Sequence, residues 1–377
     1  MDDVISLGVG EPDFVTPWRI REAGIYALEH GATTYTSNAG LPRLRELICA
    51  ELADRYRVRY DPASECVITA GVSEGLDLTL RVLLGPGEEV IVPEPCYVAY
   101  RPCVSFAGGR PVSVPTRADD GFRLHPDVIE AAVTERTKAI LIGSPANPTG
   151  AVQTRADLAA LVELAERHDL YLVSDEIYDR LTYTEAHTCL PALPGAWERT
   201  VLLGGFSKAY AMTGWRVGYL CAPRPIAELA LRMHQYTMLC APHVSQLAAV
   251  EALSAAGAEV AEMVSDYDRR RRIFVKGLRE IGLDCPEPGG AFYAFPSIRT
   301  SGLDSETFAE RLLHTQRVAV VPGNVFGAPG EGHIRCSYAT ALPLLEEALE
   351  RISRFLDGCA TGRAGDGRGG ASRGRGG

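Results

Sequence analysis

One short segment of the chain combines an amine, a hydroxyl and a guanidinium, on Lys208, Ser207 and Arg216. An amine can form a Schiff base with an aldehyde. A hydroxyl and a guanidinium can hold phosphate oxygens, the guanidinium with two parallel bonds. Gly214 and Gly218 flank Arg216 and let the backbone approach a ligand closely. The segment therefore predicts a cofactor that carries one aldehyde and one phosphate, and pyridoxal 5′-phosphate carries both.

Lys208 has a competing interpretation, because most lysines are solvated surface residues. However, it follows the apolar run 200–205, which is predicted to be a buried strand. In open α/β sheets, ligands bind at the carboxyl ends of the strands. The position of Lys208 therefore favours a functional lysine.

The ring of such a cofactor needs an acidic partner for its nitrogen. Asp175 ends the apolar run 170–174 and is the candidate, although an aspartate there would equally suit a helix cap. Glu176 beside it is the weaker candidate. Tyr178 and Asn147 are candidate donors to the ring hydroxyl, but the segment around Asn147 is also typical of a simple turn.

The phosphate needs backbone donors at the start of a helix. Residues 69–75 supply a strand end, a turn and a helix start, with Ser73 as a side-chain donor. This segment matches neither a P-loop nor a dinucleotide fingerprint. Tyr97 is the candidate to stack on the cofactor ring, and a core tyrosine is the alternative.

The predicted elements alternate between strand and helix over the first part of the chain. Strands are predicted at 65–70, 89–92, 110–114, 138–143, 170–174, 201–204 and 217–221. Several of them contain short continuous apolar runs, which are typical of strands buried on both faces. Helical patterns such as 75–84 and 155–167 lie between them. The alternation predicts an α/β fold with a mostly parallel sheet and helices on both sides.

The pattern becomes helical after residue 225, with a long charged helix predicted over 258–281. A smaller unit of strands and helices follows, at 291–295, 306–313, 318–321, 333–338 and 342–356. The predicted organisation is therefore an N-terminal segment 1–18 packing on a small domain, a large domain 19–272, the small domain 273–358, and a disordered Gly/Arg tail 359–377.

Composition excludes several classes of protein. The net charge is −10, from 48 acidic and 38 basic residues, which disfavours nucleic acid as the main partner. An Arg-Gly tail can still bind RNA, which stays an alternative. No apolar run is long enough for a membrane span, and the N-terminus lacks the features of a signal peptide. The ten cysteines form no CxxC pair, so we expect no metal site and reduced thiols in a cytoplasmic enzyme.

Five motifs together resemble the class I aminotransferases of the fold-type I pyridoxal-phosphate enzymes, most closely the prokaryotic aspartate and aromatic aminotransferases. The motifs are Gly-Val-Gly-Glu-Pro-Asp-Phe at 8–14, Tyr-Thr at 35–36, Ser-Pro-Ala-Asn-Pro-Thr-Gly at 144–150, Ser-Asp-Glu-Ile-Tyr at 174–178, and the segment 207–218. The resemblance covers residues 4–357. It implies a seven-stranded, mostly parallel sheet between helices, plus a smaller α+β domain. Only three residues precede Val4, where members of the family usually carry an additional segment.

The resemblance also implies roles around the cofactor ring. Lys208 corresponds to the Schiff-base lysine, which also moves the proton between substrate and cofactor. Asp175 corresponds to the partner of the ring nitrogen, and Tyr97 to the residue that stacks on the ring. Asn147 and Tyr178 correspond to donors to the ring oxygen. With Lys208 and Asp175, Tyr178 completes the expected catalytic set.

Further roles concern the phosphate and the substrate. The implied phosphate cup consists of Val72, Ser73, Ser207 and Arg216. Tyr35 resembles a tyrosine that reaches the phosphate of the neighbouring subunit, which implies a homodimer with shared active sites. Arg335 resembles the arginine that binds the substrate α-carboxylate, with Gly10 and Asn147 beside it, and a guanidinium is suited to that task.

The implied activity is transfer of an amino group from an L-amino acid to a 2-oxo acid, in two half-reactions. Aspartate, aromatic or similar amino acids are the expected donors, and glutamate with 2-oxoglutarate is the expected shared pair. Alternatives on the same scaffold are a C–S β-lyase or a decarboxylase. A non-catalytic sensor module of a transcription regulator is disfavoured, because Lys208 is present and no DNA-binding domain is attached.

Overall fold

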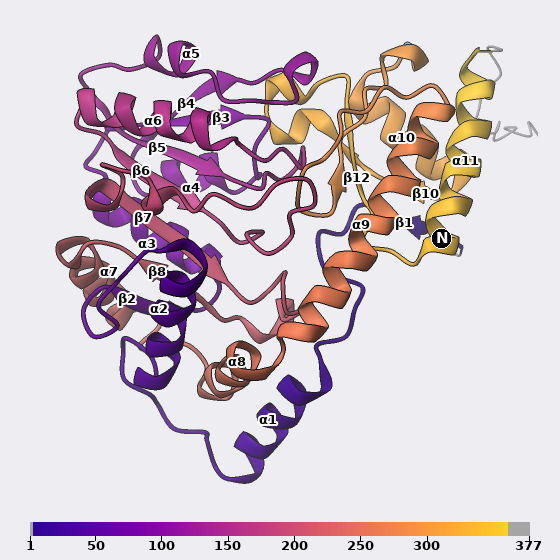
Figure 1. The fold of residues 1–377 in the computed structure, drawn as a ribbon. Coiled ribbons are helices and arrows are strands. Elements are labelled where there is room, and N and C mark those ends of the chain that lie inside the picture. The colour runs from indigo at the N-terminus through magenta and orange to yellow at the C-terminus, as the bar shows by residue number, and fades with distance from the viewer. Residues whose placement is uncertain (1–2, 361–377) are drawn as a thin grey trace, which may run out of the picture.

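The computed structural model describes residues 3–360 (Figure 1). Within these residues, seven strands form one sheet in the order β2-β8-β7-β6-β5-β3-β4. The strands are β2 (Cys66–Thr69), β3 (Glu89–Glu94), β4 (Arg110–Pro115), β5 (Thr137–Gly143), β6 (Tyr171–Asp175), β7 (Thr200–Gly205) and β8 (Gly218–Cys221). β8 runs antiparallel to both of its neighbours, β2 and β7, and the other neighbouring strands of this sheet pair in parallel. The predicted mostly parallel α/β fold is confirmed.

The sheet is covered by helices on both faces, which explains its continuous apolar strands. Ala139 and Leu141 of β5 pack in one cluster with α3 (Val72–Leu83), α4 (Tyr100–Phe106) and α7 (Arg224–Thr237). The alternate residues Ile140 and Ile142 pack in another cluster, with α5 (Pro126–Glu130) and α6 (Arg155–Arg167). Since successive side chains of a strand point to opposite faces, a strand between two helical layers must be apolar throughout.

A second group of elements gathers the C-terminal part of the chain. Its strands β9 (Tyr293–Ala294), β11 (Val321–Pro322) and β12 (Ile334–Ser337) form an antiparallel sheet in the order β11-β12-β9. The helices α10 (Ser305–Gln316) and α11 (Leu342–Ala360) lie beside it (Figure 1). Near the N-terminus, β1 (Ile5–Ser6) pairs in parallel with β10 (Val318–Ala319). The strand β1 thus lies against this C-terminal group.

Two of the predicted domain boundaries fall within helices. The helix α9 (Gly257–Glu280) is continuous across residue 272, where the large domain was predicted to end. The helix α11 extends to Ala360, because Cys359 still packs against the core. The first two residues of the predicted tail are therefore helical, and the rest of the tail lies outside the described residues.

The remaining helices are α1 (Trp18–Glu29), α2 (Pro42–Tyr56) and α8 (His243–Ala255), and α1 packs against α8 at one end of the molecule (Figure 1). No helix among residues 3–360 has the length and apolar composition that crossing a membrane requires.

Candidate active site

A cavity of about 540 Å³ lies at the carboxyl edge of the seven-stranded sheet. Of the predicted site residues, Tyr35 and the weaker candidate Glu176 do not line it. The predicted residues in its wall are Gly10, Val72, Ser73, Tyr97, Asn147, Asp175, Tyr178, Ser207, Lys208, Arg216 and Arg335. Most of them follow a strand directly, so the parallel strands bring segments distant in sequence to one edge.

Arg216 is an exception, because it precedes the antiparallel strand β8. Gly218 at its start pairs with Gly205 at the end of β7. The connection between these two glycines lines the cavity, and it carries Ser207, Lys208 and Arg216. One loop thus provides the amine, a hydroxyl and a guanidinium of the site.

Asp175 is buried at the inner end of the cavity. Its Oδ2 accepts a hydrogen bond from the Tyr100 hydroxyl at 2.8 Å, and its Oδ1 accepts one from the backbone N–H of Ile177 at 3.2 Å. Burial raises the pKa of Asp175 to about 6, although these two bonds lower it. A cationic ring nitrogen beside this carboxylate would offset the cost of its burial.

Glu176, the weaker candidate for the same role, belongs to a different environment. It is buried outside the cavity wall and accepts hydrogen bonds from Ser174 Oγ at 2.8 Å and Leu190 N–H at 2.9 Å. Its other oxygen is 2.5 Å from Nε2 of His187. Glu176 therefore fixes the segment that follows β6 and does not face the cavity.

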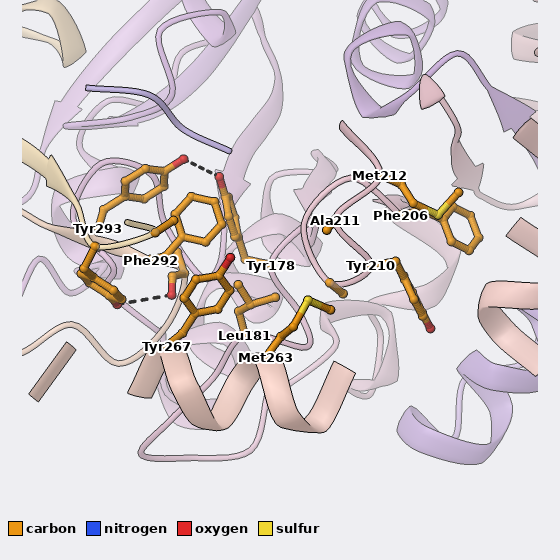
Figure 2. Close-up of a cluster of buried hydrophobic side chains, with 14 of the residues drawn as sticks. Tyr178, Leu181, Phe206, Tyr210, Ala211, Met212, Met263, Tyr267, Phe292 and Tyr293 are labelled. Carbon is orange, nitrogen blue, oxygen red and sulfur yellow. Dashed lines mark hydrogen bonds between the residues drawn. The ribbon is translucent and has the colours of Figure 1, made fainter. Parts of the chain in front are cut away.

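Tyr178, Phe292 and Tyr293 belong to one buried aromatic cluster (Figure 2). The hydroxyls of Tyr178 and Tyr293 are 2.7 Å apart, and the rings of Tyr178 and Phe292 pack edge to face. The Lys208 ammonium lies 5.8 Å from the ring centres of Tyr178 and Phe292. Burial lowers the pKa of Lys208 to about 8, although the carboxylate of Glu11 raises it. A buried lysine of this kind is readily available as a neutral amine.

The N-terminus of α3 forms the opposite end of the cavity. Gly71 precedes the helix at φ +82°, and no side chain caps the first backbone N–H groups. A Cβ on Gly218 would lie 2.8 Å from the backbone of Gly71 and Val72, so only glycine fits there. Free amides at a helix start bind phosphate well.

Arg216 lies beside these amides in a left-handed conformation, with φ 53°. Its Nη1 donates to the carbonyl of Thr213 at 2.9 Å, and its Nη2 donates to the carbonyl of Ala70 at 3.4 Å. These bonds aim the guanidinium at the start of α3, where it would meet a phosphate.

Arg335 enters the cavity from β12 and is held on several sides. Its Nη1 donates to Asn147 Oδ1 at 2.9 Å, and its Nη2 donates to the carbonyl of Gly8 at 2.6 Å. Its guanidinium lies 4.5 Å from the ring centre of Tyr293, while its buried Nε has no hydrogen-bond partner among the described residues. Gly10 lies against Tyr293, since a Cβ there would be 2.6 Å from the tyrosine hydroxyl.

These residues fit pyridoxal phosphate in composition and in arrangement. The uncapped helix start and Arg216 suit the phosphate, the buried Asp175 suits the ring nitrogen, and Lys208 lies between the two. Tyr97 lines the same cavity, edge to face with Tyr100 at 5.6 Å, and can cover a ring. Within residues 3–360 no group of three or more histidine, cysteine or acidic side chains is arranged to bind a metal ion.

Sequence reasoning missed several residues of the wall, among them Glu11, Tyr100, Thr213 and Tyr293. Tyr100 lies one helical turn beyond Tyr97, which is the one local signal for it. Tyr293 lies in an apolar strand, where a core tyrosine is the ordinary expectation. Tyr35, in contrast, was named but is 79% exposed and outside this cavity.

The chain matches known proteins over nearly its whole length. The model of the family "Aminotransferase class I and II" matches residues 2–352. "Putative aminotransferase YugH" of Bacillus subtilis (strain 168) is 56% identical over 94% of this chain and 92% of its own length. "Aspartate aminotransferase" of Pyrococcus abyssi is 45% identical, with the same shares covered. The crystal structure of an aromatic aminotransferase from Pyrococcus horikoshii OT3 superposes with a TM-score of 0.93 at 45% identity, covering 95% of this chain and 96% of that one.

Proposed function

The chain belongs to the class I and II aminotransferases and is a pyridoxal 5′-phosphate-dependent transaminase, and we propose that aspartate, aromatic or similar L-amino acids are its amino donors. Glutamate and 2-oxoglutarate are the proposed shared pair. The observation that carries the proposal is one cavity that holds both the Lys208 amine and the Arg335–Asn147 pair. The Lys208 amine suits proton transfer at Cα, and the Arg335–Asn147 pair suits binding of the α-carboxylate of an amino acid.

Arg335 is proposed to bind the α-carboxylate with two parallel hydrogen bonds. Its current bonds to Asn147 and to the Gly8 carbonyl hold the guanidinium at the cavity wall. Because it is fixed before the substrate arrives, little conformational entropy is lost on binding. A substrate held there presents its Cα to the centre of the cavity, where Lys208 lies.

Lys208 is proposed to take the Cα proton as a neutral amine and to return it on the cofactor side. Its lowered pKa suits this role, since a general base works best when its pKa is near the working pH. When bound, the cofactor supplies a ring that accepts the electron pair left at Cα. Asp175 would keep the ring nitrogen protonated, and Tyr178 and Asn147 would hold the ring oxygen.

The names of relatives support both acidic and aromatic donors, since one is called an aspartate aminotransferase and another an aromatic aminotransferase. Among the described residues, the lysines and arginines that line this cavity are Lys208, Arg216 and Arg335. Each of these three cations already has a proposed role. The distal carboxylate of aspartate would therefore need a cation from outside this wall.

The test is a screen of the purified holoenzyme with one amino acid at a time, without any 2-oxo acid. Amino acids that are donors shift the absorbance of the bound cofactor and release the matching 2-oxo acid. The shift should reverse when 2-oxoglutarate is added. Release of pyruvate and ammonia from a sulfur amino acid, with no reversal by 2-oxoglutarate, would contradict transamination.

The working unit is proposed to be a homodimer. Large apolar side chains are exposed on and after α1 and at the end of α7, namely Ile25, Tyr26, Leu28, Tyr35, Tyr236, Met238 and Leu239. The segment before Tyr35 contacts the start of α8 through a bond between the Thr34 carbonyl and His243 Nδ1 at 3.2 Å. An apolar face of this kind is typical of an interface between subunits. The cytoplasm is the proposed location, supported by ten free thiols.

Mixed dimers test the shared site. One subunit carries Lys208→Ala and the other Tyr35→Phe. If Tyr35 serves the partner's cavity, the mixed dimer has one fully native site, and half of its sites bind the cofactor with wild-type affinity. If every site that retains Lys208 shows the weakened affinity of Tyr35→Phe, Tyr35 does not cross between subunits.

A further inference from the structure

A buried carboxylate–imidazole pair lies behind the phosphate end of the cavity, outside its wall. Glu74 belongs to the first turn of α3, and His234 comes from α7. Nδ1 of His234 is 2.6 Å from Glu74 Oε1, and the histidine side chain is fully buried. Its Nε2 has no hydrogen-bond partner among the described residues. A buried polar pair with an unsatisfied atom costs stability, so the pair calls for a role beyond packing.

The second oxygen of Glu74 suggests that role. Oε2 accepts a hydrogen bond from the backbone N–H of Ala70 at 2.5 Å. The carbonyl of the same residue accepts the bond from Arg216. Ala70 is therefore held by Glu74 on one side and by the guanidinium of the phosphate cup on the other.

The turn held in this way decides where the helix amides point. Gly71 follows Ala70 directly, and α3 begins at Val72. A small displacement of Ala70 would tilt the uncapped N–H groups of Val72 and Ser73, and hydrogen bonds weaken steeply with angle. The pair thus acts on the phosphate through the turn, without touching it.

The pair also keeps the negative charge of Glu74 away from the phosphate site. A carboxylate in the first turn of a helix is favourable alone, but it would repel a phosphate bound at the same end. Both Glu74 oxygens are occupied, one by Ala70 and one by His234. Neither residue lines the cavity. The imidazole therefore keeps the carboxylate turned away from the anion.

We propose that Glu74 and His234 are positioning residues for the cofactor phosphate, an inference that rests on the function proposed above. His234 holds Glu74, Glu74 holds the Ala70 turn, and the turn aims the amides of α3. The competing role is purely structural, with the pair joining α7 to α3. The two roles differ in what they predict for a cofactor that lacks its phosphate.

The test compares the binding of pyridoxal phosphate and of pyridoxal to the apo-protein by absorbance titration. In Glu74→Gln, one carbonyl oxygen must replace two carboxylate oxygens. We expect its Kd for pyridoxal phosphate to rise about tenfold to a hundredfold, the range for a hydrogen bond to a charged group. Its Kd for pyridoxal should be unchanged. His234→Leu should behave alike, and His234→Asn, whose amide can replace the Nδ1 donor, should restore affinity to within about threefold.

The matched control is Glu228→Gln. Glu228 lies on the same helix as His234, pairs with Arg224 at 2.6 Å and is exposed, so no Kd should change. If Glu74→Gln and His234→Leu lower the melting temperature of the apo-protein but weaken both ligands equally, or neither, the positioning role is wrong. A wild-type protein that does not bind pyridoxal phosphate at all would instead contradict the function proposed for the cavity.

Discussion

The two ends of the cavity are built from different materials. The phosphate end consists of backbone amides, glycines in close contact and one guanidinium, with Ser73 exposed to solvent. The ring end consists of buried side chains, with Asp175 held by Tyr100, and Tyr178 held by Tyr293. The first end can recognise an anion by geometry alone. The second places charge where water is excluded, so that each charge acts strongly on its neighbours.

This contrast separates affinity from chemistry. Changes at the phosphate end should weaken cofactor binding and leave turnover at saturating cofactor nearly intact. Changes at the ring end should lower turnover and alter its pH dependence. Lys208 lies between the two ends and should show the largest effect of all.

Lys208→Ala removes the proposed base and covalent anchor. We expect turnover to fall about 10⁴-fold, the upper range for general acid–base catalysis. Cofactor should still bind, because the phosphate cup is intact. Steady-state kinetics and absorbance titration measure the two effects. Turnover within tenfold of wild type would show that another group moves the proton.

Asp175→Asn tests the ring end. Loss of a fixed charge beside the reacting system should lower kcat about 10²- to 10³-fold. The same change should stabilise the apo-protein at pH 7.5, because the rise of the Asp175 pKa to about 6 corresponds to about 3 kcal/mol of unfavourable burial.

The sign of the pH dependence follows from the direction of that shift. The folded apo-protein favours the protonated form of Asp175, so its destabilising effect is complete above pH 6. Below the ordinary pKa of 3.8 the effect vanishes. Thermal denaturation of both apo-proteins should therefore give melting temperatures that converge as the pH falls from 6 to 4. A constant difference would contradict the assignment.

Gly218→Ala tests the phosphate end. Its Cβ would lie 2.8 Å from the backbone of Gly71 and Val72. Overpacking of this kind costs about 1–3 kcal/mol. We expect the protein to relieve it by moving the start of α3 away from its binding geometry, so that a similar free energy is lost from phosphate binding and the Kd of the cofactor rises about tenfold to a hundredfold. Gly214→Ala is the control, since no atom lies within 4 Å of its Cβ. A lower kcat at saturating cofactor, with Kd unchanged, would contradict the idea that the phosphate end determines cofactor affinity and the ring end determines turnover.

Tyr100→Phe should give the smallest effect. It removes one hydrogen bond that lowers the pKa of Asp175, so this pKa rises further. We expect kcat to fall by up to about tenfold, as for one hydrogen bond, with the acid limb of its pH profile at higher pH. Kinetics from pH 5 to 9 measure both. A uniform decrease with an unmoved profile would mean that Tyr100 only packs.

The sequence predicted those site residues that directly follow a recognisable buried strand. Lys208, Asp175 and Asn147 each follow an apolar run, and the end of a buried strand is visible without the fold. Tyr100 and Tyr293 depend on tertiary contacts, since the partner of Tyr100 lies 75 positions away. The reversal of β8 was not predicted, although the connection between Gly205 and Gly218 lacks the helix that a parallel crossover usually contains.

That connection has a consequence for how the cofactor is retained. Lys208 and Arg216 lie on one loop whose two ends are clamped together by the pairing of Gly205 with Gly218. With the proposed roles of Lys208 and Arg216, this loop would hold the cofactor at two points. Each contact would raise the effective concentration of the other. While Lys208 is free to move the proton, Arg216 would still hold the phosphate. Escape requires both contacts to open at once, so the residence time of the cofactor should greatly exceed the time of one catalytic cycle.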